Sequence, residues 1–233
     1  SVASTSKKGR PHAEHNALYN LKTKLKKNAQ LFVTLEPCSH HGKTKPCVRK
    51  IINSKIKKVY FSVNDPDPRS YNKCKNILKK KSIHSFDGIN SKEIKIFYKS
   101  YLKYKKNKLP FVSSKLAISK DFFTKNLKNR WITNFYSRSR VHLLRSTHDC
   151  ILSSVETILH DNPSLNCRIN GLEDRSPCRI ILDNQLKVPI KSKVIKNAWK
   201  QKTIIFYNKP DHRKIQILKK FKVRLIKIHL NKD

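Results

Sequence analysis

The clearest signal in the sequence is TLEPCSHHGKTKPC at residues 34–47, preceded by HAE at residues 12–14. Together they supply one imidazole, two thiols and one carboxylate, from His12, Cys38, Cys47 and Glu14. One histidine and two cysteines form the ligand set of a catalytic zinc site, in which a fourth position stays open for water. A carboxylate outside the ligand set can then carry the proton from that water to a leaving group. We therefore expect a hydrolytic zinc centre with Glu14 as its general acid and base.

The segments around these residues predict helices and strands that alternate. Cys38 follows an apolar strand-like run at residues 31–35, and Cys47 begins a helix-like run at residues 47–52. A thiol at the start of a helix has a lowered pKa, which suits metal binding. The apolar periodicity also predicts helices at residues 12–27, 71–80 and 92–104, a strand at 58–63 and an extended run near Ile83. This alternation is typical of the α/β class with a mainly parallel sheet.

A polar, lysine-rich segment at residues 103–110 ends in proline and marks the best domain boundary. We expect a first domain at residues 1–107 and a second at residues 108–233. In the second domain the pattern predicts strands at residues 111–118, 150–153, 179–182 and 203–207, and a helix at residues 137–145.

The motifs resemble the bifunctional deaminase-reductase family of riboflavin biosynthesis. The zinc-deaminase pattern has two cysteines three positions apart, whereas Cys38 and Cys47 are nine apart, as in this family. Its second motif reads T-L-E-P-C-S-H-x-G-[KR]-T-P-P-C, and the chain departs from it only at Lys45. The resemblance continues in order through DPDP at 65–68, WIT at 131–133, LLR at 143–145, SVETILHDNPSLNCR at 154–168 and RIILD at 179–183. One departure is Phe122, which replaces a family glycine.

The resemblance implies a cytidine-deaminase-like three-layer α/β/α domain, then a partial dihydrofolate-reductase-like α/β domain, with both ends incomplete relative to the family. It implies two reactions on a phosphorylated pyrimidine. The first is zinc-dependent hydrolytic deamination of 2,5-diamino-6-ribosylamino-4(3H)-pyrimidinone 5′-phosphate, and the second is reduction of its ribosyl chain to ribityl by NADPH. The substrate contacts that it implies are Lys43, Asp65, Trp131, Arg145, Leu165 and Arg168. The NADPH contacts that it implies are Thr133, Asp161 and Asn162. For each of them, a surface or capping role is the alternative.

The net charge of +38 would suit a nucleic-acid partner. However, lysines are spread over every segment while glycine is scarce, which is typical of A/T-rich coding, and we expect no nucleic-acid partner. Cysteines other than Cys38 and Cys47 lack paired spacing, which favours free thiols in a reducing cytoplasm. No apolar run approaches 18 residues, so we expect no membrane span. The family resemblance implies a homo-oligomer.

Two other functions stay open. One is a zinc deaminase that edits tRNA, which would flip a base into the same pocket; the charge favours it, and the cysteine spacing and second half oppose it. The other is a degenerate, non-catalytic remnant, which the replaced glycines and the apparently incomplete ends favour.

Overall fold

The computed structural model describes residues 1–7, 9–21, 28–124, 131–209 and 211–229. It divides into two compact units, Ser1–Ser113 and Ser114–Asp233. Each unit contains a parallel sheet, so the expected α/β class is confirmed. The domain division expected at residues 107–108 stays a prediction. Among the described residues, no helix combines the length and apolar character needed to cross a bilayer.

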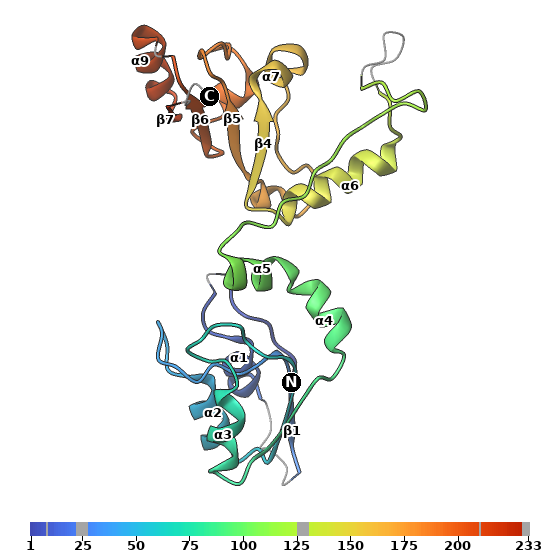
Figure 1. The fold of residues 1–233 in the computed structure, drawn as a ribbon, viewed down its shortest axis with the longest axis vertical. Coiled ribbons are helices and arrows are strands. Elements are labelled where there is room, and N and C mark those ends of the chain that lie inside the picture. The colour runs from blue at the N-terminus through green and yellow to red at the C-terminus, as the bar shows by residue number, and fades with distance from the viewer. Residues whose placement is uncertain (8, 22–27, 125–130, 210, 230–233) are drawn as a thin grey trace. The chain divides into compact units, whose positions relative to one another are not determined.

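The first unit is built on a three-stranded parallel sheet in the order β1-β2-β3. Its strands are β1 (Gln30–Leu35), β2 (Lys58–Val63) and β3 (His84–Asp87). Alternate residues of each strand point to one face, where Leu31 and Val59 are buried. The helices of this unit that carry or adjoin the motif residues are α1 (Ala13–Tyr19), α2 (Cys47–Asn53) and α3 (Lys73–Lys79). Ile51 of α2 and Leu78 of α3 complete this core, and the two helices are labelled in Figure 1.

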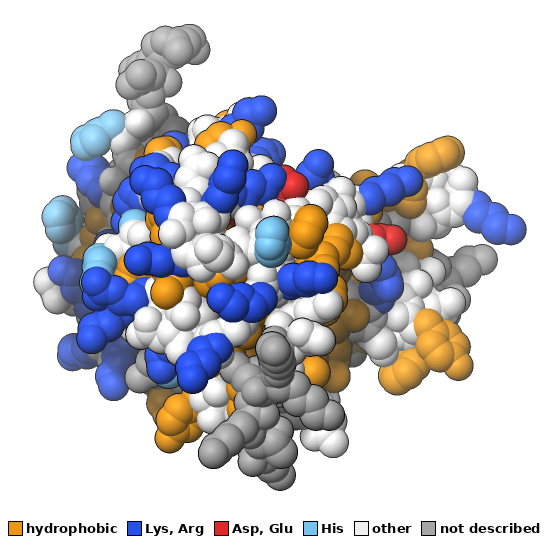
Figure 2. All heavy atoms as spheres, turned by 90° about the horizontal axis from the view of Figure 1, so that it is seen from below, with side chains coloured by type: hydrophobic (Ala, Val, Ile, Leu, Met, Phe, Trp, Pro, Cys, Tyr) orange, Lys and Arg blue, Asp and Glu red, His pale blue; other side chains and the backbone are white. Residues whose placement is uncertain are grey.

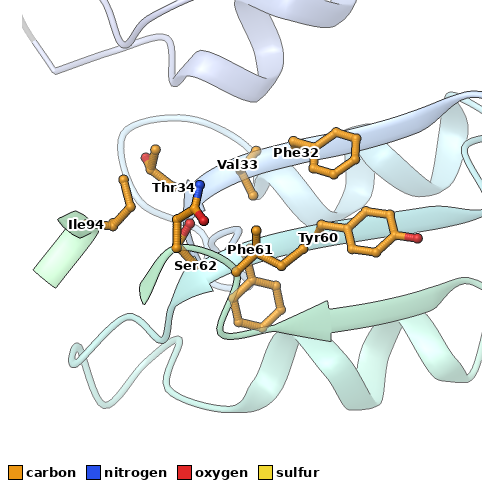
Figure 3. Close-up of a pocket in the computed structure, with 9 residues that line it drawn as sticks. Phe32, Val33, Thr34, Tyr60, Phe61, Ser62 and Ile94 are labelled. Atoms are coloured by element: carbon orange, nitrogen blue, oxygen red, sulfur yellow. The ribbon is translucent and has the colours of Figure 1, made fainter. Parts of the chain in front are cut away.

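The other face of this sheet carries an aromatic row. The ring centroids of Phe32 and Tyr60 lie 4.7 Å apart, and those of Tyr60 and Phe86 lie 4.9 Å apart. Figure 3 shows Phe32 and Tyr60 projecting from neighbouring strands beside a shallow pocket. Ile94 of α4 (Ser91–Phe97) also lines this pocket, and α4 is followed by α5 (Lys99–Asn107). Thr34 and Tyr98 join strand to helix through a hydroxyl–hydroxyl hydrogen bond of 2.8 Å.

The second unit has a four-stranded parallel sheet in the order β4-β5-β6-β7. Its strands are β4 (Cys150–Ser154), β5 (Cys178–Leu182), β6 (Thr203–Tyr207) and β7 (Arg224–Lys227). Its helices are α6 (Phe135–Ser146), α7 (Val155–Asp161), the 3-10 helix η1 (Glu173–Arg175), α8 (Lys193–Lys196) and α9 (His212–Lys220). Ile158, Ile181, Ile205 and Leu218 form the centre of its core, where each is at most 1% exposed.

Arg179 is also buried in this unit, although it is charged. Its guanidinium donates to Thr203 Oγ1 at 2.9 Å and to the main-chain oxygens of Ser164, Asn197 and Gln201. These acceptors replace water around the buried charge. Arg179 therefore ties the start of β5 to three neighbouring segments.

Three of the expected elements differ from the structure. The segment expected as a strand at residues 111–118 is not one, because it pairs with no other described strand and leaves Val112 and Leu116 exposed. A strand needs a neighbouring sheet edge, which apolar periodicity alone does not reveal. The helix expected at residues 92–104 is two helices, α4 and α5, which meet at Tyr98. Of the helix expected at residues 12–27, α1 covers Ala13–Tyr19, and residues 22–27 lie outside the described part of the chain.

Candidate active site

The first unit brings together the imidazole and the two thiols expected to bind zinc. His12 stands directly before α1, Cys38 lies in the loop after β1, and Cys47 is the first residue of α2. His12 Nδ1 lies 3.3 Å from Cys47 Sγ and 3.6 Å from Cys38 Sγ. All three potential ligand atoms lie within 4.8 Å of one another, and both cysteines are buried.

These distances fit a tetrahedral zinc ion. With Zn–S near ~2.3 Å and Zn–N near ~2.0 Å, a sulfur and a nitrogen on one tetrahedral ion stand about 3.6 Å apart. The two observed nitrogen–sulfur distances, 3.3 and 3.6 Å, are close to that value. A hydrogen bond from the Cys47 thiol, together with nearby His12, lowers the pKa of Cys38, whereas the same bond and burial raise the pKa of Cys47, so one proton is held between the two sulfurs and zinc would have to displace it. Thiolates are the form that binds metal.

Glu14 stands beside the triad without belonging to it. It lies in the first turn of α1 and is 8% exposed. Burial raises the pKa of its carboxyl, and the group also hydrogen-bonds the Cys47 side chain. A carboxyl in this position can hold a proton in one step and release it in another, which is what a general acid and base must do.

Glu36, which the sequence did not single out, fastens the neighbouring loop to the strand that leads to Cys38. Its Oε2 accepts from the backbone N–H groups of Asp65 and Asn72, each at 3.2 Å. Its Oε1 accepts from the backbone N–H of Cys74 at 3.1 Å. One buried carboxylate therefore pairs three backbone donors of residues 65–74.

Asp65 and Asp67, which follow β2, are both buried and both bonded to α5. Asp65 Oδ1 accepts from the Tyr101 hydroxyl at 2.8 Å. Asp67 accepts from Arg69 and from Lys105 Nζ, and the hydrogen bond from Arg69 is the main reason that its pKa is well below the usual range. The two acids thus join the loop after β2 to the helix that ends this unit.

Three further polar side chains of or near the motif differ in their contacts. Lys43 is exposed, whereas His40 is held by a 2.8 Å contact between its Nδ1 and Ser70 Oγ. Arg10 Nη1 lies 3.0 Å from His12 Nδ1, so a cation stands next to the ligand set. The role expected for Lys43 in substrate binding stays a prediction.

In the second unit the structure brings together some of the expected residues. Arg145 of α6 and Arg168 of the loop after α7 both contact His142. Trp131 and Thr133 are linked by Arg138, whose guanidinium lies 4.6 Å from the Trp131 ring centroid and also donates to the Thr133 carbonyl.

The other expected residues of the second unit lie at the end of α7 and beyond it. Asp161 is the exposed last residue of α7. Asn162 caps the helix with a positive φ of 41°, and its Oδ1 accepts from Lys193 N at 2.9 Å. The Leu165 side chain is buried in the core, at 6% exposure. Their roles in binding substrate or NADPH stay predictions.

Sequence reasoning missed Arg10, Glu36, Tyr101 and His142. Only Glu36 had a usable signal, because it is an acid between an apolar strand and the Pro-Cys pair. Arg10 lies two residues from its partner His12 but belongs to no motif, whereas Tyr101 and His142 contact partners that only the folded chain brings near.

The fold and the triad define a two-unit α/β protein whose first unit contains a deaminase-type metal centre. In agreement, the family model for the cytidine and deoxycytidylate deaminase zinc-binding region matches residues 2–63. The family model for the RibD C-terminal domain matches residues 110–232. The chain belongs to the RibD family.

Two relatives are similar in sequence to this chain over most of its length. The riboflavin biosynthesis protein RibD of Actinobacillus pleuropneumoniae is 34% identical over 88% of this chain and 54% of its own length. RibD of Bacillus amyloliquefaciens is 38% identical over 80% of this chain and 50% of its own length. The chain therefore spans about half the length of these curated relatives.

Two solved structures share the fold. A Thermotoga maritima diaminohydroxyphosphoribosylaminopyrimidine deaminase/5-amino-6-(5-phosphoribosylamino)uracil reductase is 31% identical with a TM-score of 0.78, covering 94% of this chain and 68% of that one. Acinetobacter baumannii RibD is 27% identical with a TM-score of 0.80, covering 95% and 62%.

Proposed function

We propose that the first unit catalyses zinc-dependent hydrolytic deamination of 2,5-diamino-6-ribosylamino-4(3H)-pyrimidinone 5′-phosphate, a step of riboflavin biosynthesis. The observation that carries the proposal is the cluster of His12 with the buried Cys38 and Cys47, and with Glu14 beside it. The family relationship supplies the substrate class. Localisation in the cytoplasm and assembly into a homo-oligomer are parts of the same proposal.

His12, Cys38 and Cys47 would hold the zinc, which when bound acts as a Lewis acid and makes water nucleophilic near neutral pH. Glu14 takes the proton from the water and returns it to the exocyclic nitrogen. The carbon–nitrogen bond breaks, ammonia leaves, and the oxygen of water stays on the ring. Lys43, which is exposed, would contact the substrate. Asp65 would accept from the pyrimidine amino groups through Oδ2, since Oδ1 is engaged by Tyr101 and the Asp67 N–H.

We further propose that the second unit reduces the ribosyl chain to ribityl with NADPH. Arg145 and Arg168 would bind the phosphate, because arginine offers a bidentate fork to phosphate oxygens and these two come from different segments to one place. Trp131 would line the ribose, and Leu165 would support it from the core. Thr133, Asp161 and Asn162 would contact the NADPH.

The test is mass analysis of products after the zinc-loaded chain is incubated with the pyrimidine substrate and NADPH. Exchange of amine for oxygen supports the deaminase, and added uptake of two hydrogens supports the reductase. Glu14→Gln should keep the zinc but abolish the exchange, whereas the matched change Glu93→Gln, at an exposed site on α4, should leave it intact. Unchanged substrate with folded, zinc-bound wild-type protein would contradict the proposal and favour a non-catalytic remnant.

The charge of the chain supports one second candidate, a deaminase acting on tRNA. In Figure 2, lysine and arginine side chains are spread over the face in view among hydrophobic and uncharged ones, and the net charge is +38. Incubation with tRNA followed by sequencing for deaminated bases tests it. Zinc-dependent base changes that Glu14→Gln abolishes would support this candidate over the pyrimidine nucleotide.

A further inference from the structure

Two cysteines of the second unit stand side by side on neighbouring strands. Cys150 is the first residue of β4, Cys178 is the first residue of β5, and the two are directly paired in the parallel register. Their side chains therefore leave the sheet on the same face. The two thiols are within hydrogen-bonding reach of each other, and both are free. The fold thus creates a dithiol from two cysteines that are distant in the sequence.

The spacing of the strands brings this pair close to the geometry of a disulfide. Adjacent strands of a sheet lie about 4.8 Å apart, and the Cα atoms of a disulfide lie about 4.4–6.8 Å apart. The Cβ atoms of a disulfide are nearer, at about 3.8 Å, so the two strand starts must approach each other by roughly 1 Å. Because both residues begin their strands, this movement involves only the first rung of the ladder. The remaining strain makes such a bond easy to reduce.

A dissolved reagent can reach both sulfurs. Cys150 is exposed, and Cys178 is partly exposed. Burial raises the pKa of Cys178, and the nearby ammonium group of Lys202 opposes that shift. Lys202 is itself exposed. A cation beside two accessible thiols attracts an anionic reagent, and glutathione disulfide is an anion that carries a reactive sulfur–sulfur bond.

We propose that Cys150 and Cys178 form a reversible disulfide by exchange with a small anionic disulfide, for which glutathione disulfide is the probe. The exposed Cys150 loses its proton and attacks one sulfur of the reagent, whose sulfur–sulfur bond breaks and releases one glutathione thiol. Cys178 then loses its proton and attacks the Cys150 sulfur, which releases the second glutathione thiol. Two electrons pass from the protein to the reagent, so one disulfide is reduced as another forms. Neither zinc nor turnover is involved, and the proposal is independent of the proposed function.

The new bond fastens β4 to β5 and closes residues 150–178 into a loop, which contains α7. A closed loop of roughly 30 residues restricts the unfolded chain and so favours the folded one, less the strain that the bond retains. Oxidation therefore stabilises the second unit, and reduction reverses the effect.

The test is incubation of the zinc-loaded 233-residue chain with glutathione disulfide, followed by peptide mapping without reductant. The expected product joins the peptides that carry Cys150 and Cys178, and an excess of reduced glutathione should separate them. Fragmentation of the linked peptides distinguishes Cys150 from Cys167, which lies on the same tryptic peptide. Cys178→Ser should instead accumulate a glutathione adduct on Cys150, because the second thiol is missing. Wild-type protein that keeps both thiols, or that holds a lasting adduct on Cys150 without a bond to Cys178, would overturn the proposal.

Urea unfolding gives an independent readout of the same bond. The oxidised wild type should have a higher urea midpoint than the same sample treated with a phosphine reductant. The matched control is Cys150→Ser, exposed to glutathione disulfide in the same way, whose midpoint should not depend on the reductant. Equal midpoints for the oxidised and reduced wild type would overturn the stabilising effect of the bond.

Discussion

Replacing Glu36 by glutamine removes one acceptor from the side chain that fastens residues 65–74 to the end of β1, the strand that leads to Cys38. The carboxylate pairs three backbone N–H groups, those of Asp65, Asn72 and Cys74. An amide has one oxygen. If that oxygen takes the place of Oε2, it keeps the bonds from Asp65 and Asn72, but the NH₂ group then faces the Cys74 N–H and leaves it unpaired.

The cost follows from these three bonds. An unpaired buried donor costs about 1–3 kcal/mol, and each retained bond loses about 1 kcal/mol when its acceptor is no longer charged. An opposing effect is that a neutral amide avoids the desolvation cost of a buried charge, the same cost that raises the pKa of Glu36. The costs sum to about 3–5 kcal/mol. If the relief from burial offsets about 1–3 kcal/mol of this, the net value is about 2 kcal/mol, which corresponds to roughly 30-fold easier opening of the loop.

Hydrogen exchange measures this opening directly. In Glu36→Gln, the backbone amides of residues 65, 72 and 74 should exchange about 30-fold faster than in the wild type if they exchange through local opening. The control Glu93→Gln changes the same functional group at an exposed position and should leave these rates unchanged. Exchange within about threefold of the wild type at all three amides would refute the assignment of Glu36 as the anchor of the loop.

Three further predictions test other parts of the structure. Cys47→Ser should weaken zinc binding by more than about 100-fold in competition with a chromogenic chelator, whereas Cys150→Ser, at an exposed site, should not. The folded-state pKa of Asp67 is lowered, mainly by Arg69, so its stabilising effect is complete above the unfolded pKa of about 3.9 and is lost as pH falls toward the folded value. Asp67→Asn should therefore reduce stability at pH 6 and have little effect in strong acid, as urea midpoints would show; equal effects at both pH values would contradict this. Arg179→Lys should destabilise the second unit by about 3 kcal/mol, because lysine can keep about one of four hydrogen bonds, each worth about 1 kcal/mol. Urea unfolding would measure this loss, and a loss below about 1 kcal/mol would contradict the prediction.

The elements that sequence predicted well are those whose signals are local. β1 and β2 are short apolar segments whose buried faces follow from side-chain alternation, and α2 begins directly after Pro46. The triad was also predictable, because a histidine before a helix and two cysteines at element ends form a pattern with few other uses. For the strands and the helix the relevant information lies within about ten residues, whereas the triad, which joins His12 to cysteines 26 and 35 residues away, was predictable from its residue types and their order.

The sequence could not show which residues are hydrogen-bonded to one another in the folded chain. The backbone N–H groups that donate to Glu36 belong to residues 29 to 38 positions further along the chain. His142 contacts Arg168, which is 26 residues away in the sequence. Residues 111–118 failed as a strand for the same reason, since apolar alternation states which side chains prefer burial but not whether a sheet edge is available. The segments that carry the metal ligands can thus be predicted from the sequence. The residues that hold these segments in place can be identified only in the folded structure, where segments distant in sequence come within hydrogen-bond distance. That difference is why the two residues with the most consequential new contacts, Glu36 and His142, were absent from the sequence-based prediction although both lie within three residues of one that was included.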